Sequence, residues 1–223
     1  NDFSFSPEII LDIIKIGLPA SLSMIVMAVG QGVFNKILVH ISVETVAAYQ
    51  VAGRLDMLVF LPIFSIAASL TTLIGMFYGA KEYEALRFTI RYGIFSALII
   101  TIFSSTTVYI FADQLVRFFT EDESIVIIAV NFLQIFAFAY PFIAVGITTG
   151  RVLQGLGKGL PVLVITIVRV LGVSAPLSLF FIFVMDKSVE WVWYSMMLST
   201  VVAFAIGLTW LVFTVKKLPV KNA

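Results

Sequence analysis

Long apolar segments alternate with short polar ones along the whole chain. Six of the apolar segments contain no Asp, Glu, Lys or Arg, and they cover residues 16–35, 57–80, 92–112, 124–150, 170–185 and 191–215. Five of them are long enough to cross the hydrocarbon layer of a membrane, which takes about 20 helical residues. The segment 170–185 reaches that length only if 159–168 joins it, which places Arg169 inside the membrane. We therefore predict six spanning helices, at about 12–39, 45–78, 90–113, 124–153, 160–185 and 190–215.

The composition agrees with an all-α membrane protein. Hydrophobic residues make up 61% of the chain and charged residues 12%, with a mean hydropathy of +1.09. Soluble globular proteins are about half apolar and about a quarter charged, which excludes a water-soluble core. The apolar segments are continuous rather than alternating, which favours helices over membrane strands. The chain has no Cys and a net charge of +1, so we expect no thiolate metal site, no cofactor and no nucleic-acid partner.

Lysine and arginine are distributed unequally between the two sets of loops. With both termini on one side, that side holds nine basic residues: Lys15, Lys81, Arg87, Arg91, Arg151, Lys158, Lys216, Lys217 and Lys221. The opposite side holds only Lys36, Arg117 and Lys187. Because short basic loops stay in the cytoplasm during insertion, we expect both termini to be cytoplasmic. The expected location is therefore the plasma membrane, the inner membrane of the cell, with several crossings.

Two prolines lie inside predicted spans. Pro62 and Pro141 each remove a backbone hydrogen bond and clash with the preceding turn, so both helices should bend there. The polar and then amphipathic segment 79–91 predicts a short helix along the cytoplasmic surface of the membrane. The segment QGLGKGLP at 154–161 predicts a tight turn, with Pro161 opening the next helix.

Amide and soft apolar side chains recur at helical spacing on three of the predicted spans. The residues with this spacing are Met24, Met27, Gln31 and Asn35 on the first, Gln50, Arg54, Met57 and Leu61 on the second, and Asn131, Gln134 and Phe138 on the fourth. Such faces suit large, flat organic molecules, because thioethers and rings adapt their packing and amides add a few hydrogen bonds. The alternative is that the amides only join helices to one another.

Asp56 is the only carboxylate deep within a predicted span. Arg54 precedes it by two residues, so the two side chains cannot meet on one helix. Asp56 is therefore a candidate coupling site for a proton or a cation. The alternative is a structural ion pair with Arg54 or Arg169 of another helix, which would hold the bundle in one arrangement. No HExxH, GxSxG or paired intramembrane carboxylates are present, so we expect no enzyme activity and no catalytic residue.

Four sequence segments resemble a known transporter family. They are GLPASL at 17–22, VAAYQVAGRLDML at 46–58 with Pro62 after it, IGMFYGAKE at 74–82, and VLQGLGKGLP at 152–161 followed by Arg169. In these segments the chain is similar to the multidrug and toxic compound extrusion (MATE) family, specifically to its carboxy-terminal six-helix lobe, over about 8–217. The resemblance implies a twelve-helix transporter of two lobes, with residues 1–223 as a single lobe and the amino-terminal lobe absent from this chain.

The resemblance also implies a function. It suggests a Na⁺- or H⁺-coupled antiporter that exports amphipathic or cationic organic compounds by alternating access. The first helix of this lobe lines the cleft in the family, so Met24, Met27, Gln31 and Asn35 are the expected substrate contacts, with Gln134 and Phe138 added from the spacing above. Some members have a cation-binding Glu eight residues after the first-helix Pro, where this chain has Met27. That site is therefore absent here.

Two other functions remain open at this level. A flippase for lipid-linked saccharides has a related fold but needs a strongly cationic cleft, and only Arg54 and Arg169 lie deep within the predicted spans. A non-transporting membrane assembly subunit of half size is the second alternative. The chain begins with Asn1 rather than Met, which we read as a piece of a longer protein or a trimmed one.

Overall fold

The computed structural model describes residues 7–219, and every regular element in that range is a helix. The elements are α1 (Pro7–Ile41), α2 (Val43–Gly79), α3 (Tyr83–Arg117), α4 (Glu123–Ala137), α5 (Tyr140–Gly155), α6 (Leu160–Ile167), η1 (Val168–Ser174), α7 (Ala175–Leu179), η2 (Phe180–Val184) and α8 (Glu190–Lys216). The segments η1 and η2 are π-helical, and the chain from α6 through η2 forms one apolar helix, Leu160–Val184. Within the described residues, five helices are long and apolar enough to cross a membrane, or six if α4 and α5 together make one bent span. The predicted all-α membrane fold is confirmed.

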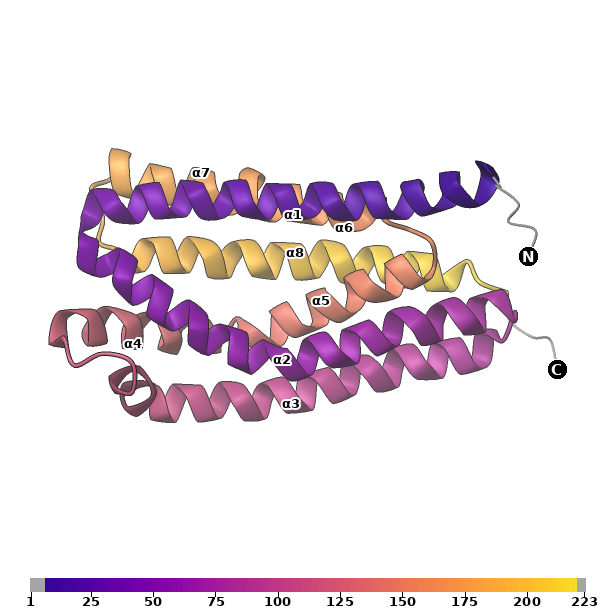
Figure 1. The fold of residues 1–223 in the computed structure, drawn as a ribbon, viewed down its shortest axis with the longest axis horizontal. Coiled ribbons are helices and arrows are strands. Elements are labelled where there is room, and N and C mark those ends of the chain that lie inside the picture. Colours follow the sequence, from indigo (N-terminus) through magenta and orange to yellow (C-terminus); the bar gives the residue numbers. More distant parts are fainter. Residues whose placement is uncertain (1–6, 220–223) are drawn as a thin grey trace, which may run out of the picture.

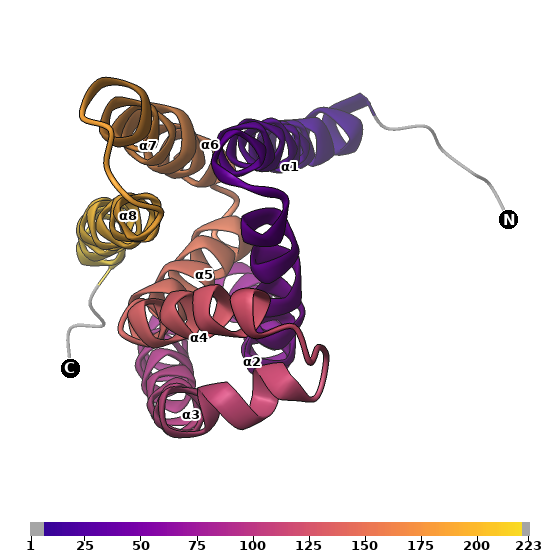
Figure 2. The same ribbon diagram turned by 90° about the vertical axis from the view of Figure 1, so that its left-hand side faces the viewer.

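The long helices run side by side along one axis, in alternating directions (Figure 1). The connections α1–α2, α3–α4 and η2–α8 lie at one end of the bundle, and α1 begins and α8 ends at the other. Viewed along the axis, α1 lies beside the helix that contains α6 and α7, and α8 lies next to that helix (Figure 2). The helices α2 to α5 form a second group below them. Six predicted spans with both termini on one side require short connections that alternate between the two ends of the bundle. The structure has this arrangement.

The interior contains two clusters of buried side chains. The larger one surrounds Trp193, Phe132 and Ile63, which are all nearly inaccessible, and includes side chains from most of the long helices. The smaller one lies where α2, α3 and α5 meet and includes Ile74 and Leu86. By contrast, α1 buries little of its surface within this chain. An apolar helix with so little covered surface faces either lipid or another protein part.

The expected bends are present. The helices α4 and α5 meet at 59°, with Pro141 in the first turn of α5. The hydroxyl of Ser105 donates a hydrogen bond to the carbonyl oxygen of Ala137, which lies at the break. This bond satisfies a carbonyl group at the interrupted end of α4. Pro62 lies near the middle of α2, and α2 changes direction part-way along its length (Figure 1).

The glycines of the α5–α6 turn have distinct structural requirements. Gly157 has φ +76°, a left-handed conformation that other residues rarely adopt. A Cβ atom on Gly155 would lie 2.7 Å from the carbonyl oxygen of Thr71 and 3.0 Å from Cβ of Ile74, both on α2. The absence of a side chain at Gly155 thus lets α5 approach the backbone of α2 closely. The predicted tight turn is confirmed, and Pro161 lies in the first turn of α6.

The predicted surface helix over 79–91 is wrong. The chain reverses between Gly79 and Tyr83, with Lys81 at φ 60°, and α3 then runs without a break from Tyr83. The amphipathic pattern has a different cause. Leu86 is buried within the bundle, while the guanidinium of Arg87 donates a hydrogen bond to the carbonyl oxygen of Leu218 at 2.9 Å. The polar face of these first turns therefore contacts the segment that follows α8.

Candidate functional site

A hydrogen bond between two helices lies beside the bend of the fourth span. The hydroxyl of Tyr140, the first residue of α5, donates to the carboxyl of Asp56 on α2. Tyr140 is fully buried at 0% exposure, and its ring meets the ring of Phe60 edge-on at 5.3 Å. Packing and hydrogen bonding therefore hold the Tyr140 side chain in one position. The only carboxylate deep within the spans is connected directly to the helix that bends.

A tyrosine on the same helix lies near both this carboxyl group and Arg169. Tyr49 lies two turns before Asp56 on α2 and stacks on Trp193 of α8, with ring centroids 5.9 Å apart. Tyr49 interacts electrostatically with both Asp56 and Arg169, which lies on the π-helical segment η1. The cluster of Tyr49, Asp56, Tyr140 and Arg169 therefore joins α2, α5 and η1. We call these four residues the polar cluster.

The polar cluster corrects one expectation from the sequence. Among the described residues, Asp56 forms no ion pair with Arg54 or Arg169, unlike Arg117, which pairs with Asp113 and with Glu123. Tyr140 takes the place of the expected arginine as the hydrogen-bonding partner of Asp56. Tyr140 was not predicted as the partner of Asp56, because a tyrosine in an apolar span is usually interpreted as part of the core.

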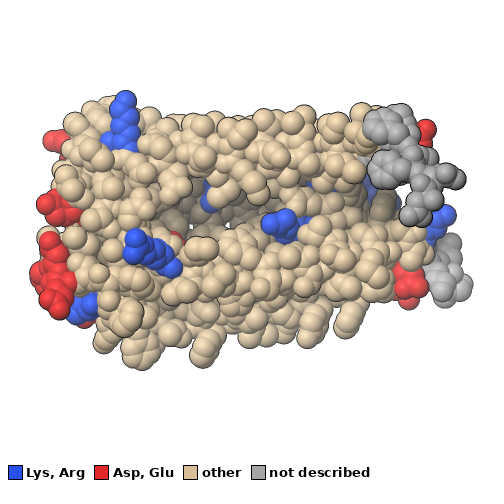
Figure 3. Space-filling view, viewed as in Figure 1, with Lys and Arg blue, Asp and Glu red and all other residues tan. Residues whose placement is uncertain are grey.

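Arg54 lies outside the polar cluster. It is exposed on the surface of α2, although it precedes Asp56 by only two residues. Two residues correspond to about 200° around a helix, so the two side chains leave α2 on nearly opposite sides. The face containing α1 and α2 is hollowed between these helices, and basic side chains lie in and beside the hollow (Figure 3). The long middle section of the same face is almost free of carboxylates.

The predicted substrate contacts of α1 lie on its uncovered surface. Met24 is 70% exposed, Met27 is 51% exposed and Gln31 is exposed as well. Asn35 is partly buried, and its side-chain oxygen accepts a hydrogen bond of 3.4 Å from the amide nitrogen of Gln50 on α2. The amide-containing faces of α1 and α2 thus meet near the end of the bundle at which these helices are joined.

The predicted contacts of the fourth span lie apart from those of α1. Gln134 is exposed, and Phe138 is 64% exposed and packs edge-on against Tyr109 of α3 at 5.6 Å. The helix α4 packs mainly on α2, α3 and α8. Asn131 differs from both, because its side-chain oxygen is buried without a hydrogen-bond partner. This lobe does not bring Gln134 and Phe138 together with the α1 residues.

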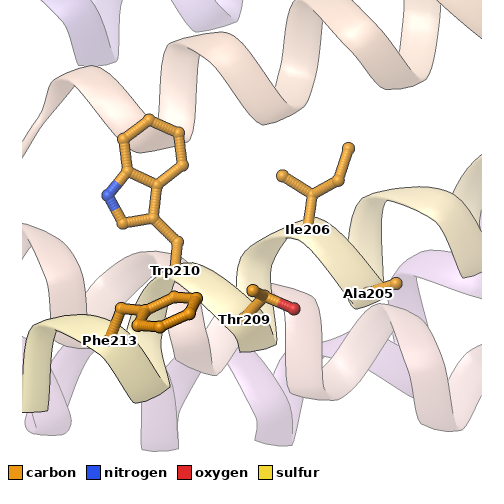
Figure 4. A pocket seen from close by; sticks show the side chains of 5 residues that line it. All are labelled: Ala205, Ile206, Thr209, Trp210 and Phe213. Carbon is orange, nitrogen blue, oxygen red and sulfur yellow. The ribbon is translucent and has the colours of Figure 1, made fainter. Parts of the chain in front are cut away.

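A shallow hollow on α8 has a different character. It is lined by Ala205, Ile206, Thr209, Trp210 and Phe213, which all belong to one helix (Figure 4). Substrate sites combine an apolar lining with several converging polar groups, and here the only polar groups are one hydroxyl and one indole. This hollow suits an acyl chain better than a substrate. Within the part of the chain that the structure describes, no group of three or more His, Cys, Asp or Glu could hold a metal ion.

Comparison with known proteins gives consistent matches. The family model described as MatE matches residues 19–180. "Probable multidrug resistance protein NorM" of Thermotoga maritima is 28% identical over 176 residues, which are 79% of this chain and 37% of that protein. The solved structure of "MATE in the bent conformation" superposes with a TM-score of 0.90 at 28% identity, over 97% of this chain and 48% of its own.

A second solved structure gives the same result. The "outward-facing conformation of a multidrug resistance MATE family transporter of the MOP superfamily" also has a TM-score of 0.90 at 28% identity. It covers 98% of this chain and 49% of its own. The chain therefore spans about half the length of these structures, and a smaller part of the curated relative.

Proposed function

Since the chain belongs to the MatE family of membrane transporters, we propose that it forms the carboxy-terminal six-helix lobe of an antiporter that exports amphipathic organic compounds. The observation that carries this proposal is the superposition of nearly the whole chain on about half of each solved transporter. A second lobe of the same protein would be its partner. Transport would proceed by alternating access, as the two lobes rock about a central site in the plasma membrane.

The uncovered surface of α1 supports the proposed position of the substrate cleft. An apolar helix that packs poorly within its own lobe has a surface left for the other lobe or for a bound compound. Met24 and Met27 supply adaptable thioethers on that surface, and Gln31 and Asn35 supply amide groups. Gln134 and Phe138 would contribute only if the transported compound or the second lobe reaches the α4 surface.

Asp56 is the proposed coupling residue, with H⁺ or Na⁺ as the coupling ion. Among the described residues it is the one carboxylate deep within the spans, and its hydrogen bond to Tyr140 connects it to the bend between α4 and α5. A coupling ion can drive transport only if its affinity differs between the two conformations of the transporter. A carboxyl group whose partner lies at a helix bend meets this condition, because a change in the bend would alter the bond.

The test is export by the complete protein that contains this chain, expressed in cells that lack other efflux pumps. Gradient-dependent export of ethidium or norfloxacin is expected. Asp56→Asn should abolish the dependence on the ion gradient, whereas Glu121→Gln, which removes an exposed loop carboxylate, should leave it intact. Absence of gradient-dependent export of every compound tried would refute the proposal.

The exposed Arg54 gives the flippase alternative one specific observation in its favour. A lipid-linked pyrophosphate needs a cationic cleft, and Arg54 would supply part of it. Under this alternative, Arg54→Ala abolishes binding of the lipid-linked substrate, whereas under the antiporter proposal it barely affects export of compounds that have no anionic group. A half-size assembly subunit, the remaining alternative, would show neither activity in any preparation.

A further inference from the structure

One exposed charge lies in the middle of the lobe without a partner. Between the charged ends of the spans, the sequence contains three ionisable Arg or Asp residues, Arg54, Asp56 and Arg169. Asp56 is hydrogen-bonded to Tyr140, and Arg169 is partly buried within the polar cluster. Arg54 is exposed, and within residues 7–219 it has neither a hydrogen bond nor an ion pair.

The depth of Arg54 makes exposure to lipid untenable. Arg54 follows Val43, the first residue of α2, by eleven residues, which corresponds to about 16 Å at 1.5 Å per residue. Because α2 has 37 residues and is therefore about 55 Å long, it extends beyond a hydrocarbon layer of about 30 Å. Arg54 lies about 10 Å from the middle of this helix, which is within the layer. A guanidinium at that depth is costly unless it faces water, a ligand or a charged partner. The α2 surface around Arg54 therefore belongs to the cleft rather than to the lipid boundary.

The neighbours of Arg54 define the chemistry of that surface. Gln50 lies one turn before it and is connected to Asn35 of α1, while Met57, 63% exposed, lies one turn after it. The surface thus combines a guanidinium, amide groups and soft apolar side chains, and none of these neighbours is a carboxylate. The only carboxylate at this depth, Asp56, leaves α2 on the opposite side towards Tyr140. The net charge presented to the cleft by this part of the lobe is therefore positive.

We propose that Arg54 binds the anionic group of the transported compound, so that this lobe selects amphipathic compounds that carry a carboxylate, sulfonate or phosphate. This inference rests on the proposed transport function and narrows its substrate class. The guanidinium would donate two parallel hydrogen bonds to the anionic group, a geometry that Lys reproduces poorly. The apolar part of the compound packs against Met57 and the exposed methionines of α1. Compounds that are only cationic, such as ethidium, would bind at this position more weakly than compounds that also carry an anionic group.

Charge complementarity favours an anionic occupant, and the amide and thioether groups beside Arg54 favour a small amphipathic ligand among the anionic ones. A carboxylate of the second lobe is the main competitor for Arg54, and an anionic lipid headgroup is another. Each competitor predicts a different response when the charge of the transported compound or of the membrane is changed. The experiment therefore varies both.

The probes are rhodamine B, which carries a free carboxylate, and its ethyl ester, which has the same rings without the negative charge. Binding to the complete purified protein is measured by fluorescence anisotropy, and export is measured in cells that lack other pumps. The wild-type protein should prefer the free acid. Arg54→Gln should lower the ratio of acid to ester affinity about tenfold, the size expected for one hydrogen bond to a charged group. Arg54→Glu should invert the preference, and Arg54→Lys should retain part of it.

The matched control is Arg91→Gln. This substitution removes an exposed arginine near the start of α3, away from the cleft-facing surface. It should leave the ratio unchanged. Equal binding of acid and ester by the wild-type protein would overturn the inference. Export of either dye would still support the transport function in that case. An equal loss of both dyes in Arg54→Gln would also overturn the inference, because it indicates pairing with the second lobe. Loss of folding in Arg54→Lys, monitored by size-exclusion chromatography, would show a structural role and overturn it too.

The lipid competitor is tested in proteoliposomes. Dye binding in phosphatidylcholine is compared with binding in phosphatidylcholine mixed with phosphatidylglycerol. Unchanged affinity for rhodamine B supports a site reserved for the transported compound. Displacement of the dye by phosphatidylglycerol would assign Arg54 to a lipid headgroup and overturn the inference. If neither dye binds or is exported and other compounds are not exported either, the proposed function itself fails.

Discussion

The close approach of α5 to α2 can be tested by adding a single methyl group. In Gly155→Ala the new Cβ atom would lie 2.7 Å from the carbonyl oxygen of Thr71 and 3.0 Å from Cβ of Ile74. Neither neighbour is the end of a flexible side chain, so the two helices must separate. Overpacking of this kind costs about 1–3 kcal/mol of stability. The smaller cluster of buried side chains, to which Ile74 belongs, would be disturbed first.

Gly146→Ala is the control on the same helix. A Cβ atom on Gly146 would meet nothing within 4 Å, so only the helix propensity changes. Replacing Gly by Ala inside a helix stabilises it by up to about 1 kcal/mol. Both variants receive some of that gain, and only Gly155→Ala carries the packing cost. We therefore expect Gly155→Ala to be less stable than Gly146→Ala by about 1–3 kcal/mol.

The assay uses the complete protein that contains this chain, purified in detergent. The fraction that remains monodisperse after heating is followed by size-exclusion chromatography as the temperature is raised. Gly155→Ala should lose its monodisperse peak at a lower temperature than the wild type, and Gly146→Ala should not. If Gly155→Ala matches Gly146→Ala over the whole temperature range, then α5 does not touch the backbone of α2 and the described helix packing is wrong.

Three further predictions concern the polar cluster, the core and the topology. Tyr140→Phe leaves Asp56 without its donor and should cost about 1–3 kcal/mol in the same thermal assay. Trp193→Ala empties a fully buried site and should cost about 3–5 kcal/mol, with Trp193→Phe losing less. The chain has no Cys, so Lys81→Cys and Lys187→Cys can each be labelled alone. Impermeant maleimide should reach them from opposite sides of the membrane, and labelling from the same side would contradict the alternation of helices.

Much of the fold follows from local properties of the sequence. Charged residues in a lipid layer are costly enough that uncharged runs mark the helices almost directly. The bend at Pro141 was predictable because the missing amide hydrogen has a fixed consequence for the backbone. The failure at 79–91 has an equally local origin. An amphipathic pattern reports that one face is polar, but it does not distinguish a membrane surface from a contact with another part of the chain, here Leu218.

The π-helical turns are the part of the fold that the sequence did not indicate. Pro176 lies just after η1, and its ring conflicts with the carbonyl group of the preceding turn in a regular helix. The wider turn of η1 is one way to relieve such a conflict, but hydrophobic periodicity over so few residues cannot distinguish it from an α-helical turn. Arg169 lies within this wider turn, so its exact orientation could not be derived from helical spacing.

The polar cluster shows a more general limit. Helical spacing correctly separated Arg54 from Asp56, because a step of two residues always directs side chains to different sides of a helix. It could not identify the partner of Asp56, since Tyr140 is 84 residues away and is brought near only by the packing of α5 against α2. The candidate substrate residues have the same status. The structure shows how exposed they are, but which of them bind a compound stays a prediction.

The two-residue spacing of Arg54 and Asp56 gives α2 two separate electrostatic roles. On the side that faces the interior of the lobe, Asp56 is hydrogen-bonded to Tyr140 of α5. On the exposed side of α2, no carboxylate of the described residues forms an ion pair with Arg54. A change at Asp56 therefore acts first on the α2–α5 contact, whereas a change at Arg54 acts first on whatever occupies the cleft. If both residues serve transport, the coupling between ion and compound must pass through α2 itself, because this helix is what the two side chains share.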